Sequence, residues 1–288
     1  MNPRLVLAMA SLTIHETARR RILWVLLGLS VASVLLVGWG VERLVTIARE
    51  EQVDELQLRI GVSQVLILIA FMFSFVLAMS GAFLAAPAIA SDVESGTVLA
   101  MLARPLRRAE LVLGRWLGLS VVVAVYAVGS GLLAIAVVNL VSGHAPPEPW
   151  VALAFLAFQA IAVLTLALAL GTRLPGIAAG AISVVVFGLA WFAGVLGAVA
   201  RAFDADPLAA ATDTFRVLVP TDGLWRGVIY GLEPPLVVLM SAGRGREALE
   251  GNPFCAAAPP PTPFVAWACA WVVLVLLAGV LLFRRREL

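Results

Sequence analysis

The sequence predicts an all-α integral membrane protein with six transmembrane helices and both termini in the cytoplasm. Hydrophobic residues make up 62% of its 288 residues and charged residues only 13%, whereas a soluble domain carries about 25% charged residues. The apolar residues form six long runs, each long enough to supply the roughly 20 residues that a helix needs to cross a bilayer. We therefore expect a single transmembrane domain over residues 1–288.

The predicted spans cover residues 22–41, 62–90, 117–141, 151–170, 177–200 and 264–283. We expect the first span to be retained rather than cleaved as a signal peptide. Its apolar run exceeds the usual length of about 7–15 residues, and the charged Glu42 follows it instead of a small-residue cleavage site. Trp24 and Trp39 lie near its two ends, where tryptophans anchor a helix at the membrane surfaces.

The orientation follows from the arginines, which are all 20 of the basic residues. With a cytoplasmic amino terminus, 12 of them fall on the cytoplasmic side and 8 outside, and five of those 8 lie in the long segment 201–263. Charges in a loop that long have little influence on topology. The clusters at 19–21 and 284–286 adjoin spans, so we predict a multi-pass protein of a prokaryotic-type cytoplasmic (inner) membrane.

The first twenty residues predict an amphipathic helix along the cytoplasmic membrane surface. Leu5, Met9 and Leu12 recur at helical spacing, and an arginine cluster follows near the lipid phosphates. An unstructured basic leader is the alternative.

The extracytoplasmic loop 201–263 predicts a further short helix that begins at Thr221 or Asp222 and ends before Pro234 and Pro235. Its apolar residues share one side: Leu224, Trp225, Val228, Ile229 and Leu232. At about ten residues it is too short to cross the bilayer, as is the apolar run 236–240, so we interpret both as interfacial or re-entrant.

The predicted spans contain no Asp, Glu, Arg or His. Ion-coupled transporters keep ionisable groups in the membrane, so a secondary transporter is disfavoured, and an integral-membrane enzyme is disfavoured more, since no catalytic residues are predicted. Gln64 and Gln159 are polar exceptions that indicate either helix–helix hydrogen bonds or a substrate path.

The sequence also contains few residues that could bind a metal ion or a nucleotide. The two Cys and two His show no metal-ligand spacing, so no metal site is predicted. The chain has no lysine, and a P-loop needs one for the β- and γ-phosphates of ATP. We expect no cofactor on this chain, and any ATP and Mg²⁺ to bind to a partner. Every arginine cluster adjoins a span, which favours contact with the lipid bilayer and not with nucleic acid.

The stretch "SDVESGTVLAMLARPLRRAELVLGR", residues 91–115, is the charged exception between the second and third spans. Ser91-x-x-Glu94 fits a capping box, which predicts that a helix starts just after the membrane. Gly96 interrupts this helix, Thr97 starts a second one over "VLAMLA", and Pro105 forces a bend before the third. The middle helix either docks into a partner or lies on lipid headgroups.

The same stretch resembles the signature of the permease subunits of ABC type-2 exporters: an acidic residue, Gly-Thr, a Leu-rich turn, Pro, a basic residue and a Leu-x-Gly-basic ending. The matching positions are Glu94, Gly96, Thr97, Pro105, Arg108, Gly114 and Arg115. "PTD" at 220–222 and the arginine-rich end are similar, more weakly, to the permease of the nitrous-oxide-reductase maturation transporter.

This resemblance implies a permease that pairs with a second permease copy and with two ABC ATPase subunits, which dock on the cytoplasmic coupling segment 91–116. The coupling residues it implies are Glu94, Gly96, Thr97, Leu99, Met101, Leu102, Arg104, Pro105, Arg107, Arg108, Gly114 and Arg115. A membrane anchor or scaffold that recruits a soluble partner without transport is the alternative from another class.

Overall fold

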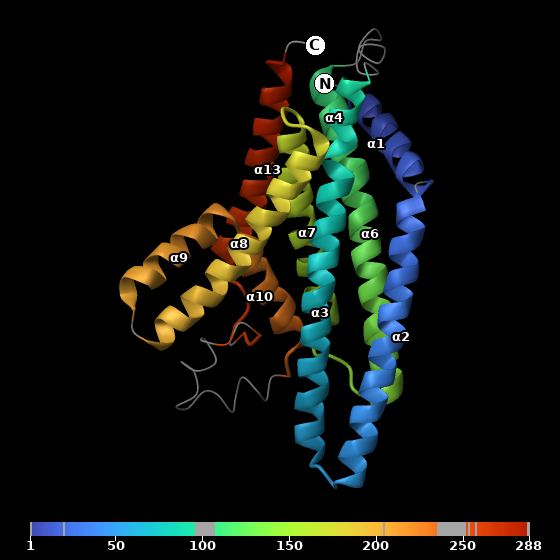
Figure 1. Cartoon of the computed structure of the whole chain (residues 1–288), viewed down its shortest axis with the longest axis vertical. Helices are drawn as coiled ribbons and strands as arrows, with labels where there is room; N and C mark the ends of the chain where they lie inside the picture. Colours follow the sequence, from blue (N-terminus) through green and yellow to red (C-terminus); the bar gives the residue numbers. More distant parts are fainter. Residues whose placement is uncertain are drawn as a thin grey trace.

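The computed structural model describes residues 2–19, 21–95, 107–203, 205–234, 252, 254–256 and 258–286. Regular structure in these ranges is helical, in ten helices labelled as in Figure 1. Their bounds are α1 Pro3–Ala18, α2 Arg21–Glu50, α3 Glu55–Ala85, α4 Pro87–Glu94, α6 Arg108–Ser142, α7 Pro149–Gly171, α8 Gly176–Ala202, α9 Asp206–Leu218, α10 Thr221–Leu232 and α13 Thr262–Arg284.

Six helical segments are long and apolar enough to cross a membrane, which confirms the six predicted spans: α2, α3 with α4, α6, α7, α8 and α13. Both termini and the ends of α4 and α6 that flank residues 96–106 lie at the same end of the bundle (Figure 1). This arrangement is the one that six consecutive crossings require.

The helices α2 and α3 are longer than the predicted spans and form a hairpin that extends past the other helices (Figure 1). Their 30 and 31 residues correspond to about 45 Å each at 1.5 Å per residue. Val41, Val45 and Ala48 of α2 are buried, so apolar packing continues into the charged region 42–59. Residues 42–50 and 55–59 therefore belong to these two helices.

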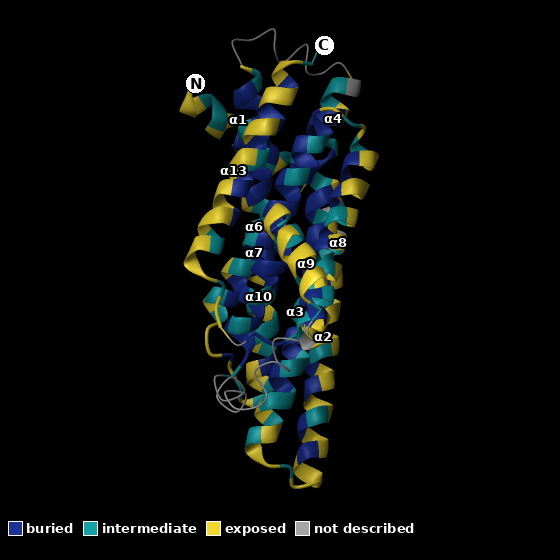
Figure 2. Cartoon of the chain, turned by 90° about the vertical axis from the view of Figure 1, so that its left-hand side faces the viewer, coloured by how far each residue is buried: buried dark blue, intermediate teal, exposed yellow. Residues whose placement is uncertain are grey.

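The middle of the bundle is α7, which is apolar on all sides and contacts α3, α6, α8, α10 and α13. A helix with no polar face is expected in a core, and Figure 2 shows buried residues gathered along the central helices. Many small residues on α7 allow close approach of its neighbours.

The end of the second span differs from the prediction. Pro87 has no N–H to continue the hydrogen-bond ladder, and α3 stops at Ala85 before α4 begins. Ser91 lies inside α4, where its hydroxyl donates to the Pro87 carbonyl at 2.6 Å. The predicted helix start at Ser91 is therefore wrong: Glu94 is the last residue of a helix that began at Pro87, and that helix ends just before Gly96.

The amino-terminal helix is confirmed as α1, which excludes an unstructured leader, and one side of it packs on α6. Leu12 is 50% exposed, whereas Ala10, Thr13 and Thr17 are buried against α6. Small and β-branched residues form the contact because α6 presents glycines there. Met9 also packs on α6, beside Gly114, whereas Leu7 and Leu12 are exposed.

The short helix α10 is confirmed with its predicted start and end, and its five apolar residues named above are all buried. Another side of α10 carries glycines four residues apart. At Gly227 and Gly231 an added Cβ would lie 2.4 Å from the Phe155 ring and 2.6 Å from the Ala152 nitrogen, both on α7. The helix is therefore packed against α7 inside the protein.

The helix α9 was not predicted. It packs along α8, and its last carbonyls, of Val217 and Leu218, accept hydrogen bonds from the indole nitrogens of Trp267 and Trp271 on α13 at 2.8 and 2.7 Å. These bonds satisfy carbonyl groups that a helix end leaves unpaired. Tertiary contacts therefore stabilise α9 where its own sequence gave a weak signal.

Candidate coupling site

The candidate site is formed by the ends of α4 and α6 that flank residues 96–106. Of the coupling residues predicted above, seven lie outside the described residues: Gly96, Thr97, Leu99, Met101, Leu102, Arg104 and Pro105. The structure places Arg107, Arg108, Gly114 and Arg115 at the start of α6, and the backbone of Glu94 at the end of α4.

Arg115 joins three helices at this site. Its side chain is only 5% exposed, and its two terminal nitrogens donate to Glu16 of α1 at 2.5 Å and to Asp92 of α4 at 2.8 Å. The planar fork of a guanidinium can reach two carboxylates in this way. The two ends of the connection 96–106 are thereby tied together at its base.

Glu110 holds the beginning of α6 to the beginning of α1. Its carboxylate is 2% exposed and accepts from the backbone nitrogens of Arg107 at 3.0 Å and Asn2 at 2.7 Å. A carboxylate at this position satisfies unpaired N–H groups and interacts favourably with the helix dipole. The amino-terminal residue of α6 and the segment before α1 therefore share one buried acceptor.

Arg108 contacts the other end of the chain. Its Nη1 donates to the carbonyls of Phe283, Arg284 and Arg286 at 3.2, 3.2 and 2.6 Å. A cation at a helix carboxyl end is stabilising, so Arg108 caps α13. Arg286 in turn donates to the Thr172 carbonyl at 2.7 Å, after α7.

Two glycines let α1 lie directly on α6. A Cβ added at Gly114 would lie 2.4 Å from the Cβ of Met9, and one added at Gly118 would lie 2.7 Å from the carbonyl oxygen of Ala10. Only glycine allows this approach. Gly114 and Arg115, the last two positions of the signature, therefore form the joint between α1 and α6.

The two glutamines predicted as a possible substrate path lie away from the coupling site. Gln159 of α7 is buried, and its Nε2 donates to the Thr221 carbonyl at 3.1 Å, which ties the start of α10 to α7. Gln64 of α3 is half-buried beside Cys255. Burial, with the nearby Glu233 carboxyl, raises the pKa of the Cys255 thiol to about 12.

Cys255 is buried, Cys269 is exposed, and both are free thiols.

The six candidate spans fit a membrane transport subunit, and the comparison with protein families shows to which family it belongs. The family described as ABC-2 family transporter protein matches residues 7–288. This chain belongs to that family. It is accordingly a membrane permease component of an ABC transporter, as the signature in 94–115 indicated. Among curated proteins, no match is found.

Sequence reasoning missed the partners of the permease's buried arginine. Glu16 is the sole acidic residue before Glu42, which is a usable signal for a structural ion pair. Asp92 carried no comparable signal, because it lies 23 residues from Arg115 in the sequence. Asn2 was missed because its bond to Glu110 uses the backbone.

Proposed function

We propose that the permease is the membrane-spanning half of an ATP-driven exporter, a homodimer on which two separate ATPase subunits dock through the connection 91–115. The observation that carries the proposal is the pairing of the buried Arg115 side chain with Asp92 and Glu16. It makes the base of the connection one rigid unit with α1, α4 and α6.

A rigid base is what mechanical coupling needs. A force applied to residues 96–106 acts on the ends of α4 and α6, which the Arg115–Asp92 ion pair joins, with 2.8 Å between Nη2 and Oδ2. Because Glu16 and Glu110 join α1 to the same helix end, the three helices move together. Arg108 extends the unit to the end of α13.

The composition of the chain supports a separate ATPase as the source of energy. The permease has no lysine with which to build a P-loop, and among the described residues no cluster of three His, Cys, Asp or Glu could hold a metal ion. ABC-2 permeases work with ATPase subunits, and a neighbouring reading frame for one would identify the candidate.

The experiment co-purifies the permease with that ATPase and measures ATP hydrolysis in nanodiscs. Gly96→Trp changes the connection, and Gly40→Trp is the matched control, since Gly40 has no atom within 4 Å of an added Cβ. We expect G96W to insert normally but to lose ATPase stimulation, while G40W keeps it. Equal stimulation by both variants would contradict coupling, and a co-purifying partner that hydrolyses no ATP would favour the scaffold alternative.

A further inference from the structure

A pocket of about 410 Å³ lies beside α10, at the ends of α8 and α13 that are away from the two termini. Three arginines line it, Arg201 on α8, Arg216 on α9 and Arg226 on α10, together with the prolines 259–261 and Phe264. The coupling site is at the opposite end of the bundle, so this pocket is separate from it.

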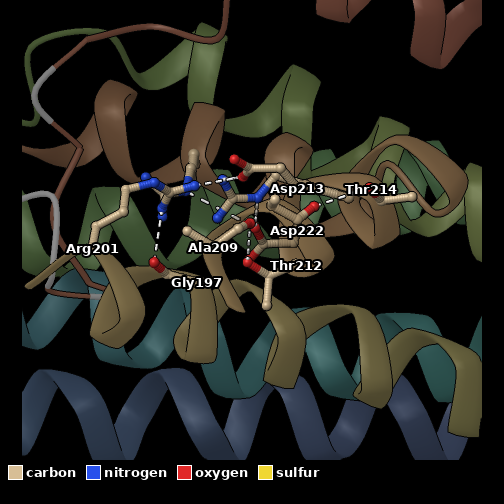
Figure 3. Close-up of polar contacts among 10 residues, drawn as sticks. Gly197, Arg201, Ala209, Thr212, Asp213, Thr214 and Asp222 are labelled. Atoms are coloured by element: carbon tan, nitrogen blue, oxygen red, sulfur yellow. Dashed lines mark hydrogen bonds and ion pairs between the residues drawn. The ribbon is translucent and has the colours of Figure 1, made fainter. Parts of the chain in front are cut away.

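Among the described residues, the three arginines pair with two carboxylates, and Figure 3 shows one of these pairs, Arg201 with Asp213. Asp213 pairs with Arg201 at 2.5 Å and with Arg216 at 3.5 Å. Asp222 pairs with Arg216 at 2.7 Å and, more weakly, with Arg226 at 3.9 Å. Three guanidinium groups thus share two carboxylates, which leaves one positive charge uncompensated within this group.

The surplus charge is partly buried. The Nη2 atom of Arg216 is buried and has no hydrogen-bond partner among the described residues. The Arg226 side chain is 25% exposed, and burial, more than the nearby Arg216 charge, lowers its pKa. Buried donors of this kind are costly unless a partner satisfies them, so the pocket is suited to an anion.

The other wall of the pocket is apolar and lies at a defined depth. Prolines 259–261 and Phe264 line it, and Phe264 is in the first turn of α13 while Arg201 is in the last turn of α8. Both helices are membrane-spanning candidates. Their ends lie at the level of the lipid headgroups, where an anionic head and an apolar body occur together.

We propose that this pocket binds an anionic amphiphile, with its phosphate on Arg216 and Arg226 and its apolar part against Phe264. Guanidinium forks match phosphate oxygens with paired hydrogen bonds. A membrane phospholipid is the source of this chemistry that the depth of the pocket favours, and free phosphate is the other.

The test measures binding of a fluorescent short-chain phosphatidylglycerol to the purified permease in detergent. Arg226→Gln removes the arginine with the weakest ion pair, and Arg59→Gln is the control, since Arg59 lies outside the pocket and its side chain is 58% exposed. Loss of one hydrogen bond to a charged group lowers binding affinity by about 10-fold or more. We expect R226Q to weaken binding by about 10-fold, R59Q to leave it unchanged, and phosphatidylcholine to compete poorly.

A second variant makes the test independent of folding effects at Arg226. Ala258 lines the pocket and is exposed, so Ala258→Glu adds a carboxylate to the pocket without disturbing the core, and it should weaken binding as well. Unchanged binding in both R226Q and A258E would overturn the site. Displacement of the lipid by inorganic phosphate at similar concentration would overturn the amphiphile assignment.

Discussion

The joint between α1 and α6 can be tested by adding one methyl group. In Gly118→Ala the new Cβ would lie 2.7 Å from the Ala10 carbonyl oxygen and 2.8 Å from the Thr13 Cβ. Carbon atoms pack at about 3.5–4.0 Å, and a backbone oxygen cannot rotate away, so α1 has to move. Overpacking of this kind costs about 1–3 kcal/mol.

The matched control is Gly129→Ala on the same helix, where an added Cβ has nothing within 4 Å. Both substitutions gain about 1 kcal/mol of helix propensity, and this gain cancels in the comparison. We therefore expect G118A to be less stable than G129A by about 1–3 kcal/mol in the free energy of unfolding. Unfolding of the purified permease in SDS mixed micelles measures the difference. Equal stability would show that α1 does not rest on α6, and would refute the reasoning about the rigid base.

Three further substitutions test other contacts. Arg115→Gln leaves two carboxylates without their shared cation and should cost about 2–3 kcal/mol, whereas Arg59→Gln, which breaks a solvated pair, should cost under about 0.5 kcal/mol; similar losses in SDS unfolding would argue against the buried pair. Trp271→Phe removes a donor to the carboxyl end of α9, so hydrogen exchange in α9 should accelerate, unlike in the exposed-site control Trp150→Phe. Burial, with a smaller effect of Arg59, lowers the pKa of His144. The unfolded chain then binds the proton first as the pH falls below about 6.5, so stability should fall from pH 7 to pH 5, and His144→Gln should remove this dependence.

The helices that cross the membrane could be predicted because hydrophobicity and length decide them. The predicted span 151–170 is α7 at Pro149–Gly171, and α10 was predicted from its polar start, its apolar side and the two prolines that follow it. The helix α9 was missed, although Pro207 in its first turn and its mixed apolar and polar residues are helix signals; contacts with α8 and two tryptophans stabilise it. Ser91 misled the prediction because a capping-box pattern also fits the interior of a helix that Pro87 starts.

The sequence predicted some residues of the candidate site but not their contact partners. The signature pointed to Gly114 and Arg115, but the partner of each lies on another helix: Met9 and Glu16 are both on α1. Arg108 is another position of the signature, and its contact with the end of α13 could not be predicted from the local pattern. Pairings across about 100 residues or more follow from the packing of the bundle, which a local pattern does not encode.

The most direct test of ATPase docking is a photo-cross-link from the connection in the assembled complex. A photoreactive residue at Leu99 should cross-link to the ATPase subunit, and one at Pro147, in the connection at the other end of α6, should not. A Leu99 probe that reaches lipid alone, or that is labelled from the side opposite the ATPase, would contradict the account.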